Sequence, residues 1–277
     1  MTDYLDRMPD YHNPAVASAL DELSLWSARF GVVLLDHIPL TRGLTILDLG
    51  CGTGFPLLEL AQMCGSSCHL VGVDVWREGL DRAARKRETY DLTNVTLVAF
   101  DGTTLPFAAD YFDLIVSNLV LNNVEHPGAL LTECARVAKP GAQLILTTNP
   151  RGHMREFYDV YREVLVELGD ARYLDRLVAD EDRRGTTESV RHLLKRAGFD
   201  ITKVIEERTR LRYLDGGALL GHMLTRVGFL GGWREVVDAP DERAVFADLE
   251  RRLNARARRQ GALEMTVPLL YLEARRS

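Results

Sequence analysis

The segment of residues 44–64 limits the possible folds of this chain more than any other. It opens with an apolar run, Leu44–Leu49, which predicts a fully buried strand. Three glycines follow, Gly50, Gly52 and Gly54. Apolar residues then recur with the spacing of one helix face, at Leu57, Leu58, Ala61 and Cys64. Because glycine lets a ligand approach the backbone and a helix N-terminus offers unpaired N–H groups, this order predicts a nucleotide site.

The spacing of these glycines distinguishes between kinds of nucleotide site. Dinucleotide-binding turns need a small third residue for close contact of helix and strand, and here Phe55 occupies that place. No Lys-Ser or Lys-Thr pair follows, as a phosphate loop requires. The pattern D-x-G-x-G-x-G from Asp48 to Gly54 instead resembles the first motif of class I S-adenosylmethionine-dependent methyltransferases. A tight turn without a ligand is the alternative.

Polar side chains also lie at the ends of three further predicted strands. The strand His69–Val75 has Asp74 near its end, about 20 residues after the glycines, where an acidic residue suits the hydroxyls of a ribose. The strand Val95–Phe100 is followed by Asp101, and the strand Phe112–Asn118 ends in an amide. Because ligands bind at the carboxyl ends of parallel strands, we expect these side chains to share one site.

The resemblance to this family implies an α/β fold. It is a three-layer sandwich around a seven-stranded, mostly parallel sheet whose last strand is antiparallel. Residues 1–40 are expected to form an N-terminal helical cap, and residues 41–150 the S-adenosylmethionine-binding core. Residues 151–185 are predicted to be a helical insertion. Residues 186–277 complete the sheet, with a helical excursion at about 212–262 that could serve as a lid.

Three more strands complete the predicted sheet. Lys139-Pro140-Gly141 predicts the end of a helix ahead of a fifth strand at Leu144–Thr148. Later apolar runs predict the last two strands near Ile201–Leu211 and Val267–Ala274.

The resemblance also implies the cofactor, S-adenosylmethionine, with S-adenosylhomocysteine as its product. Asp48 and the glycine turn are expected to hold the methionine portion, and Asp74 to accept the ribose hydroxyls. Val75 and Trp76 offer apolar and aromatic surface for the adenine. Aspartates at such places also serve as helix caps or turn residues. The expected cofactor-binding residues are Asp48, Gly50, Cys51, Gly52, Thr53, Gly54, Asp74, Val75, Trp76, Asp101, Gly102, Thr103, Asn118 and Leu119.

Two candidate catalytic residues, Glu125 and His126, follow the fourth predicted strand. His126 could take a proton from an acceptor hydroxyl, or the two residues could cap the next helix. The strand continues as Asn-Leu-Val-Leu from Asn118, not as the Asn-Pro-Pro-Tyr of family members that methylate amide or nucleobase nitrogens. This difference disfavours DNA adenine and protein glutamine as acceptors.

Two segments outside the expected core bear on the acceptor. The excursion that begins at Tyr213 is too apolar for a free surface helix. It packs on the sheet or in a dimer, or it forms a lid over a pocket for an apolar acceptor. Residues 251–259 include five arginines and follow several acidic residues, so they predict a solvated, largely neutralised helix or a contact with an anionic acceptor or RNA. The apolar residues of the excursion are Leu219, Leu220, Met223, Leu224, Val227, Phe229, Leu230 and Trp233.

Composition restricts the remaining possibilities. A net charge of −6 disfavours a nucleic-acid partner, and the four cysteines lack metal-ligand spacing, so no metal is expected. Neither a signal peptide nor a membrane span is predicted, and we expect a cytoplasmic monomer or homodimer. The leading hypothesis is a methyltransferase acting at oxygen or carbon of a small, apolar acceptor. The alternatives are an RNA or protein methyltransferase and a non-enzymatic S-adenosylmethionine-binding protein.

Overall fold

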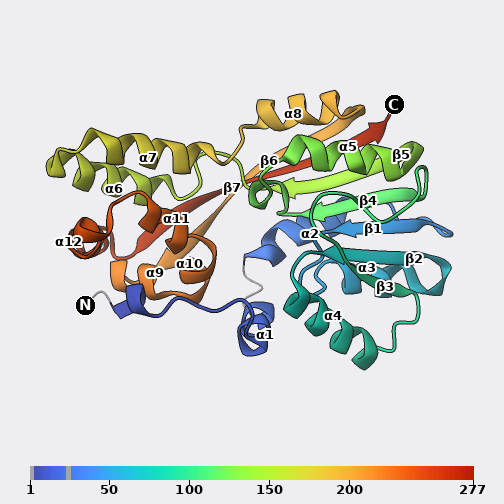
Figure 1. Cartoon of the computed structure of the whole chain (residues 1–277), viewed down its shortest axis with the longest axis horizontal. Coiled ribbons are helices and arrows are strands. Elements are labelled where there is room, and N and C mark those ends of the chain that lie inside the picture. Colours follow the sequence, from blue (N-terminus) through green and yellow to red (C-terminus); the bar gives the residue numbers. More distant parts are fainter. Residues whose placement is uncertain (1–2, 23–25) are drawn as a thin grey trace. The chain divides into compact units, whose positions relative to one another are not determined.

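The computed structural model of this protein describes residues 3–22 and 26–277 (Figure 1). They form two compact units, which we describe separately. The core unit comprises residues 11–148, 186–206 and 269–277. The helical unit comprises the residues up to Asp10 and residues 149–185 and 207–268.

The sheet has seven strands in the order β3-β2-β1-β4-β5-β7-β6. Strands β1 to β5 pair in parallel, whereas β7 runs antiparallel to β5, with Gln143 opposite Arg275. This arrangement confirms the predicted fold class. The strands are β1 (Thr45–Leu49), β2 (His69–Asp74), β3 (Val95–Ala99), β4 (Phe112–Asn118), β5 (Ala138–Thr148), β6 (Phe199–Tyr213) and β7 (Leu263–Arg276).

The predicted bounds of the fifth strand were wrong. Strand β5 begins at Ala138, six residues before the predicted start at Leu144, and therefore includes Lys139-Pro140-Gly141. The helix before it, α5 (Pro127–Val137), ends directly at the strand. Pairing explains the difference, because Ala138 lies opposite Phe112 at the start of β4 and extends the ladder past a local irregularity.

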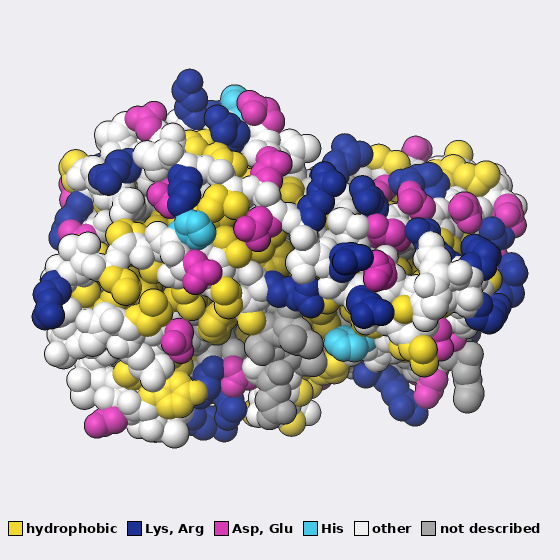
Figure 2. Space-filling view, turned by 180° about the vertical axis from the view of Figure 1, so that it is seen from behind, with side chains coloured by type: hydrophobic (Ala, Val, Ile, Leu, Met, Phe, Trp, Pro, Cys, Tyr) yellow, Lys and Arg dark blue, Asp and Glu magenta, His cyan; other side chains and the backbone are white. Residues whose placement is uncertain are grey.

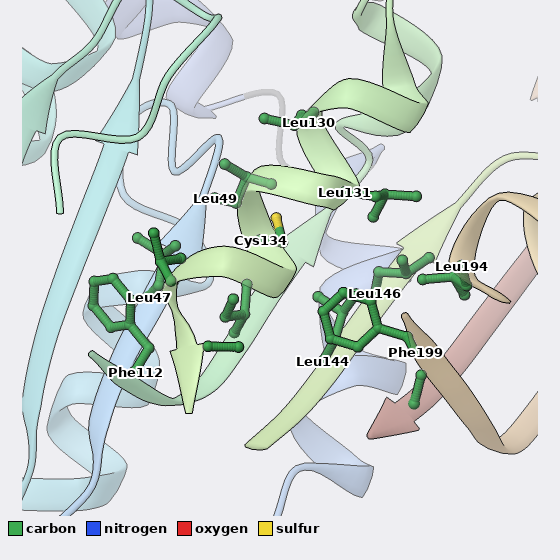
Figure 3. Packing of buried hydrophobic residues seen from close by; sticks show 14 of the residues in the cluster. Leu47, Leu49, Phe112, Leu130, Leu131, Cys134, Leu144, Leu146, Leu194 and Phe199 are labelled. Atoms are coloured by element: carbon green, nitrogen blue, oxygen red, sulfur yellow. The ribbon is translucent and has the colours of Figure 1, made fainter. Parts of the chain in front are cut away.

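One face of the sheet carries the main apolar core of this unit (Figure 3). Helices α5 and α8 (Thr187–Arg196) supply side chains to it, including Leu131 and Leu194, both almost fully buried. Burial of each such side chain contributes roughly 1.5–3 kcal/mol. The alternation of side chains along β1 places Leu47 and Leu49 in this core and turns Asp48 to the other face.

Further helices cover the other parts of the core unit: α1 (Pro14–Glu22), α2 (Ser27–His37), α3 (Leu57–Cys64) and α4 (Arg77–Thr89). Helix α3 approaches β2 so closely that a Cβ on Gly72 would lie 2.4 Å from Cδ2 of Leu57. Helix α1 contacts α4, and α2 contacts β4 and β5. The glycine turn connects β1 to α3. Helices α1 and α4 pack against each other.

The helical unit has a core of its own. Trp233 is 1% exposed and stacks on Phe157 with ring centroids 3.8 Å apart. Leu219, Leu220 and Leu230 of the predicted excursion are completely buried. This burial accounts for the apolar character of the excursion within the described part of the unit. Its helices are α6 (Arg155–Leu168), α7 (Ala171–Asp182), α9 (Gly216–Gly221), α10 (Met223–Gly228), α11 (Leu230–Glu235) and α12 (Ala239–Gln260), with a 3-10 turn at Asp3–Asp6.

The arginine-rich stretch forms the last turns of α12. Arg251 and Arg252 both bond to Asp248 of the same helix, and Arg252 also bonds to Glu167 of α6. Basic and acidic side chains are interspersed over this unit in Figure 2. The pairing of these arginines agrees with the predicted solvated helix. Within the described residues, no helix combines the length and apolar character needed to cross a lipid bilayer.

Candidate functional site

The glycine turn is held in a conformation that needs glycine. Gly50, Gly52 and Gly54 have φ angles of 74°, 51° and 100°, a region that other residues rarely adopt. The N–H groups of Gly50 and Cys51 donate to the carbonyl oxygen of Val73, at 2.8 and 3.0 Å, and so attach the turn to β2. The Cys51 side chain itself is buried. Backbone rather than side chains therefore forms the open side of this turn.

Two of the glycines also allow close packing. A Cβ on Gly50 would lie 2.2 Å from Cγ2 of Val120, which follows the end of β4. A Cβ on Gly54 would lie 2.8 Å from Cδ1 of Leu58 in α3. At Gly52, by contrast, a Cβ would have none of the described atoms within 4 Å. The middle of the turn thus borders open space.

Asp74, at the end of β2, is fixed beside the turn by backbone groups. Its Oδ2 accepts a hydrogen bond from the N–H of Gly52 at 2.7 Å, and its Oδ1 accepts one from the N–H of Trp76 at 2.8 Å. An ionised carboxylate has about four acceptor positions. Asp74 therefore keeps acceptor capacity for the hydroxyls of a ribose.

Asp48 has a different environment, although it lies near Asp74. It is completely buried, and neither carboxylate oxygen has a hydrogen-bond partner among the described residues. Burial, and then the charge of Asp74, raise the pKa of Asp48 to about 8; the N–H of Leu57 is too poorly placed for a full hydrogen bond and opposes this change only in part. Buried polar atoms without partners are rare and suggest an absent binding partner.

The residues expected at the adenine form a partly exposed surface. Val75 is 58% exposed, and a Cβ on Gly102 would lie 3.3 Å from its Cγ1. The Trp76 ring packs edge-on against Tyr11, and its Nε1 donates to the carbonyl oxygen of Tyr11 at 3.0 Å. One face of this surface is thus covered by the N-terminal segment, while Val75 stays accessible.

Asp101 forms a turn after β3. Its Oδ1 accepts hydrogen bonds from Oγ1 and the N–H of Thr103, at 2.7 and 2.8 Å. These bonds, with a third from the N–H of Thr104, lower the pKa of Asp101. The turn role that the sequence allowed for this residue is therefore realised. Its exposed carboxylate stays ionised and can accept further bonds.

At the end of β4, the Asn118 side chain is held by hydrogen bonds and the backbone of Leu119 is strained. The Asn118 Oδ1 accepts from Oγ1 of Thr147 at 2.6 Å, and its Nδ2 donates to the carbonyl oxygen of Ser27 at 3.2 Å. Leu119 has a φ of 66°, which costs a residue other than glycine about 1–3 kcal/mol. Its N–H donates to the carbonyl oxygen of Thr147 at 3.0 Å. Such strain is typical of binding sites.

Glu125 and His126 lie together on the surface. His126 Nε2 is 3.9 Å from Glu125 Oε1, and the two side chains are 78% and 89% exposed. His126 occupies the N-cap position of α5, but its side chain makes no capping bond. The two residues are adjacent in the chain and both largely exposed, and their catalytic role stays a prediction.

One contact with the turn was not predicted from the sequence. Asp21 of α1 accepts a hydrogen bond from Oγ1 of Thr53 at 3.0 Å. It also accepts bonds from Arg82 and Lys86 of α4, at 2.9 and 2.5 Å. These partners lie 32 to 65 residues away in the chain, so neither spacing nor local pattern could have revealed the cluster.

These residues fit the cofactor that the motif resemblance implies. The buried oxygens of Asp48 lack partners, the turn is open beside Gly52, and Asp74 retains acceptor positions. Val75 adds exposed apolar surface. Carboxylates suit a ribose and an ammonium group, and apolar surface suits an adenine face.

Comparison with known proteins agrees with this fit. Residues 47–146, which include every expected cofactor-binding residue, match a family model described as a methyltransferase domain. An arsenite methyltransferase from Aquipseudomonas alcaligenes is 30% identical over 215 residues, covering 73% of this chain and 56% of that protein. A ubiquinone/menaquinone biosynthesis C-methyltransferase from Vibrio campbellii is 29% identical over 174 residues, 58% of this chain and 66% of that protein.

A solved structure of a SAM-dependent methyltransferase from Aquifex aeolicus has a similar fold. Its TM-score is 0.55 at 23% identity, and the match covers 70% of this chain and 92% of that one. The chain spans about half the length of several curated relatives that it matches. The residues matched by the family model, 47–146, all lie in the core unit.

Proposed function

Because this chain belongs to the class I, Rossmann-like family of S-adenosylmethionine-dependent methyltransferases, we propose that it methylates a small, apolar acceptor at oxygen or carbon. The observation that carries this proposal is the cluster of Asp48, Asp74 and the open glycine turn at one edge of the sheet. S-adenosylmethionine, when bound, supplies an electrophilic methyl group on a positively charged sulfur.

The protein's own task is to bind, orient and exclude water. We propose that Asp74 accepts the ribose hydroxyls and that Val75 covers a face of the adenine. Asp48 and the glycine turn, including Cys51 and Thr53, hold the methionine portion. The strained backbone at Asn118 and Leu119 faces the amino-acid part. Trp76, Asp101, Gly102 and Thr103 complete the adenine side.

The proton released by an oxygen acceptor needs a destination. We propose Glu125 and His126 for this role, since the imidazole can accept a proton near neutral pH. Their exposure means that acceptor binding has to exclude water from them. Replacing His126 by Ala should then slow turnover without changing affinity for S-adenosylhomocysteine.

Two observations support a small-molecule acceptor: the names of the relatives, and the net charge of −6, which disfavours a nucleic acid. The names of two relatives indicate arsenite and quinone precursors as their substrates, both small molecules. The helical unit lies entirely outside the matched segment, so we propose that it determines the choice of acceptor. An RNA or protein methyltransferase is the second candidate, and a non-enzymatic S-adenosylmethionine-binding protein the third.

Calorimetric titration with S-adenosylhomocysteine, with NAD as the control ligand, tests the proposal. Saturable binding of the first ligand alone is expected and justifies a screen of apolar acceptors. Asp74→Ala should weaken this binding about tenfold or more, because each hydrogen bond to a charged group contributes roughly 1.5–3 kcal/mol. Absence of binding to the wild-type protein would contradict the function, and unchanged affinity of Asp74→Ala would contradict the place given to the ribose.

A further inference from the structure

Asp21 connects a helix near the N-terminus to the middle of the glycine turn. Its side chain is 12% exposed and accepts the hydroxyl of Thr53 at 3.0 Å. Two more contacts attach the same N-terminal segment to the start of α4. Trp76 Nε1 donates to the carbonyl oxygen of Tyr11 at 3.0 Å, and His12 Nδ1 lies 3.4 Å from Oε1 of Glu78. The segment is therefore anchored at both ends of α1.

Helix α4 keeps Asp21 charged. Arg82 Nε and Lys86 Nζ donate to its two oxygens at 2.9 and 2.5 Å. Burial alone raises the pKa of Asp21, but the bonds from Lys86, Arg82 and Thr53 lower it below its ordinary value. A hydrogen bond to an ionised acceptor is about twice as strong as one between neutral groups. The hydroxyl of Thr53 thus has a strong and fixed partner.

The turn needs such partners because glycines separate its other residues. Gly52 is held by Asp74 at 2.7 Å, and the adjacent Thr53 is held by Asp21. Consecutive residues of the turn are therefore bonded to carboxylates from two different elements. A segment that is ordered before a ligand arrives loses less conformational entropy on binding.

We infer that Asp21 is a positioning residue for cofactor binding, which acts through Thr53 to hold the glycine turn in its ligand-binding conformation. This role rests on the proposed function, in which the turn binds S-adenosylmethionine. It assigns to α1 a part in affinity for the cofactor, in addition to its packing on α4.

A double-mutant cycle tests this role, with S-adenosylhomocysteine as the titrant in calorimetry. Asp21→Ala should weaken binding by about tenfold to a hundredfold, the effect of losing one charge-assisted hydrogen bond. In a Thr53→Val background the same replacement should have no further effect, because the bond is already absent. Asp81→Asn removes an exposed charge from α4 and serves as the matched control, with unchanged affinity expected.

Hydrogen exchange of the ligand-free protein separates positioning from general stability. In Asp21→Ala, the amides of residues 50–54 should exchange faster, and Asp21→Asn, which keeps an acceptor oxygen, should recover part of the affinity. Equal effects of Asp21→Ala in both backgrounds would overturn the inference, as would wild-type affinity in Asp21→Ala. No binding by the wild-type protein would instead contradict the proposed function.

Discussion

Two aspartates at neighbouring strand ends show how environment changes the chemistry of one residue type. Asp74 accepts two backbone N–H groups and remains partly exposed. Asp48 is fully buried without a hydrogen-bond partner among the described residues. Asp74 therefore has backbone donors on both oxygens and keeps free acceptor positions. The pKa of Asp48, in contrast, is raised to about 8 by burial and by the charge of Asp74.

The raised pKa of Asp48, about 8, predicts how stability depends on pH. Between about pH 4 and pH 8 the unfolded chain loses this proton while the folded protein retains it, so the folded state binds more protons. The free energy of unfolding should therefore decrease as pH rises through this range. Asp48→Asn, which cannot ionise, should lack this decrease, as measured by calorimetric melting at several pH values.

The comparison of the two proteins is the informative quantity, because other groups titrate over the same range. The stability of wild type relative to Asp48→Asn should fall steadily from about pH 5 to pH 8 and then level off. A constant difference across this range would mean that Asp48 ionises normally in the folded protein.

Among single residues, the sequence predicted those whose role depends on their neighbours in the chain. Asp74 ends β2 and Asp48 is the last residue but one of β1, and the apolar run of each strand identifies these positions. The bonds of Asp21 to Thr53 and Lys86 depend on the packing of α1 on α4, for which the sequence has no local signal. The positive φ of Leu119 was equally unpredictable, because residues other than glycine rarely adopt such values.

Among the elements, the glycine turn allows the sharpest test, since its glycines serve different purposes. Gly52→Ala places a methyl group in open space and should leave the protein folded, at a cost of about 1–2 kcal/mol for its positive φ. It should strongly weaken binding of S-adenosylhomocysteine, because that space is where the cofactor is proposed to lie. Melting and calorimetric titration of the same sample separate these two effects.

Two further variants control for strain and for packing. Gly43→Ala has the same features, a positive φ of 79° and open space, but lies before β1, so it should lose stability without losing affinity. Gly50→Ala creates a contact of 2.2 Å with Val120 and should be the least stable of the three. If Gly52→Ala binds as well as Gly43→Ala does, the cofactor does not approach the turn there.

The strands of the core were predictable because each is a short apolar run followed by a polar end. The predicted and observed bounds of β4 coincide, and those of β1 and β2 differ by one residue. Strand β5 was predicted too short, since Pro140 and Gly141 disfavour a strand locally. Pairing of Ala138 with Phe112 overcomes that preference. Long-range pairing is the information that a local pattern lacks.

At the scale of the molecule, the chain alternates between its two units. The helical unit is assembled from three separate stretches, and so is the core unit. The sequence indicated that the excursion after Tyr213 was too apolar for a surface, but not what would bury it. The structure shows that residues far apart in the chain, such as Phe157 and Trp233, do so within the helical unit.

Because the helical unit has a core of its own, we predict that it can be destabilised without affecting the core unit. Trp233 stacks on Phe157, and its Nε1 donates to the hydroxyl of Tyr158 at 3.1 Å. Trp233→Ala should destabilise the unit by about 3–5 kcal/mol, the usual cost of removing a buried aromatic ring. Hydrogen exchange should then accelerate in residues 149–185 and 207–268.

Affinity for S-adenosylhomocysteine should stay that of the wild type in Trp233→Ala, because every proposed contact lies between Asp48 and Leu119. Trp233→Phe keeps an aromatic ring but loses the bond to Tyr158. It should accelerate exchange in the same residues as Trp233→Ala, but to a smaller extent. If exchange accelerates equally in residues 41–148, the two units unfold as one cooperative body. In that case the acceptor-determining part could not be altered without cost to the cofactor site, and changes in acceptor would have to be sought at exposed positions of the helical unit.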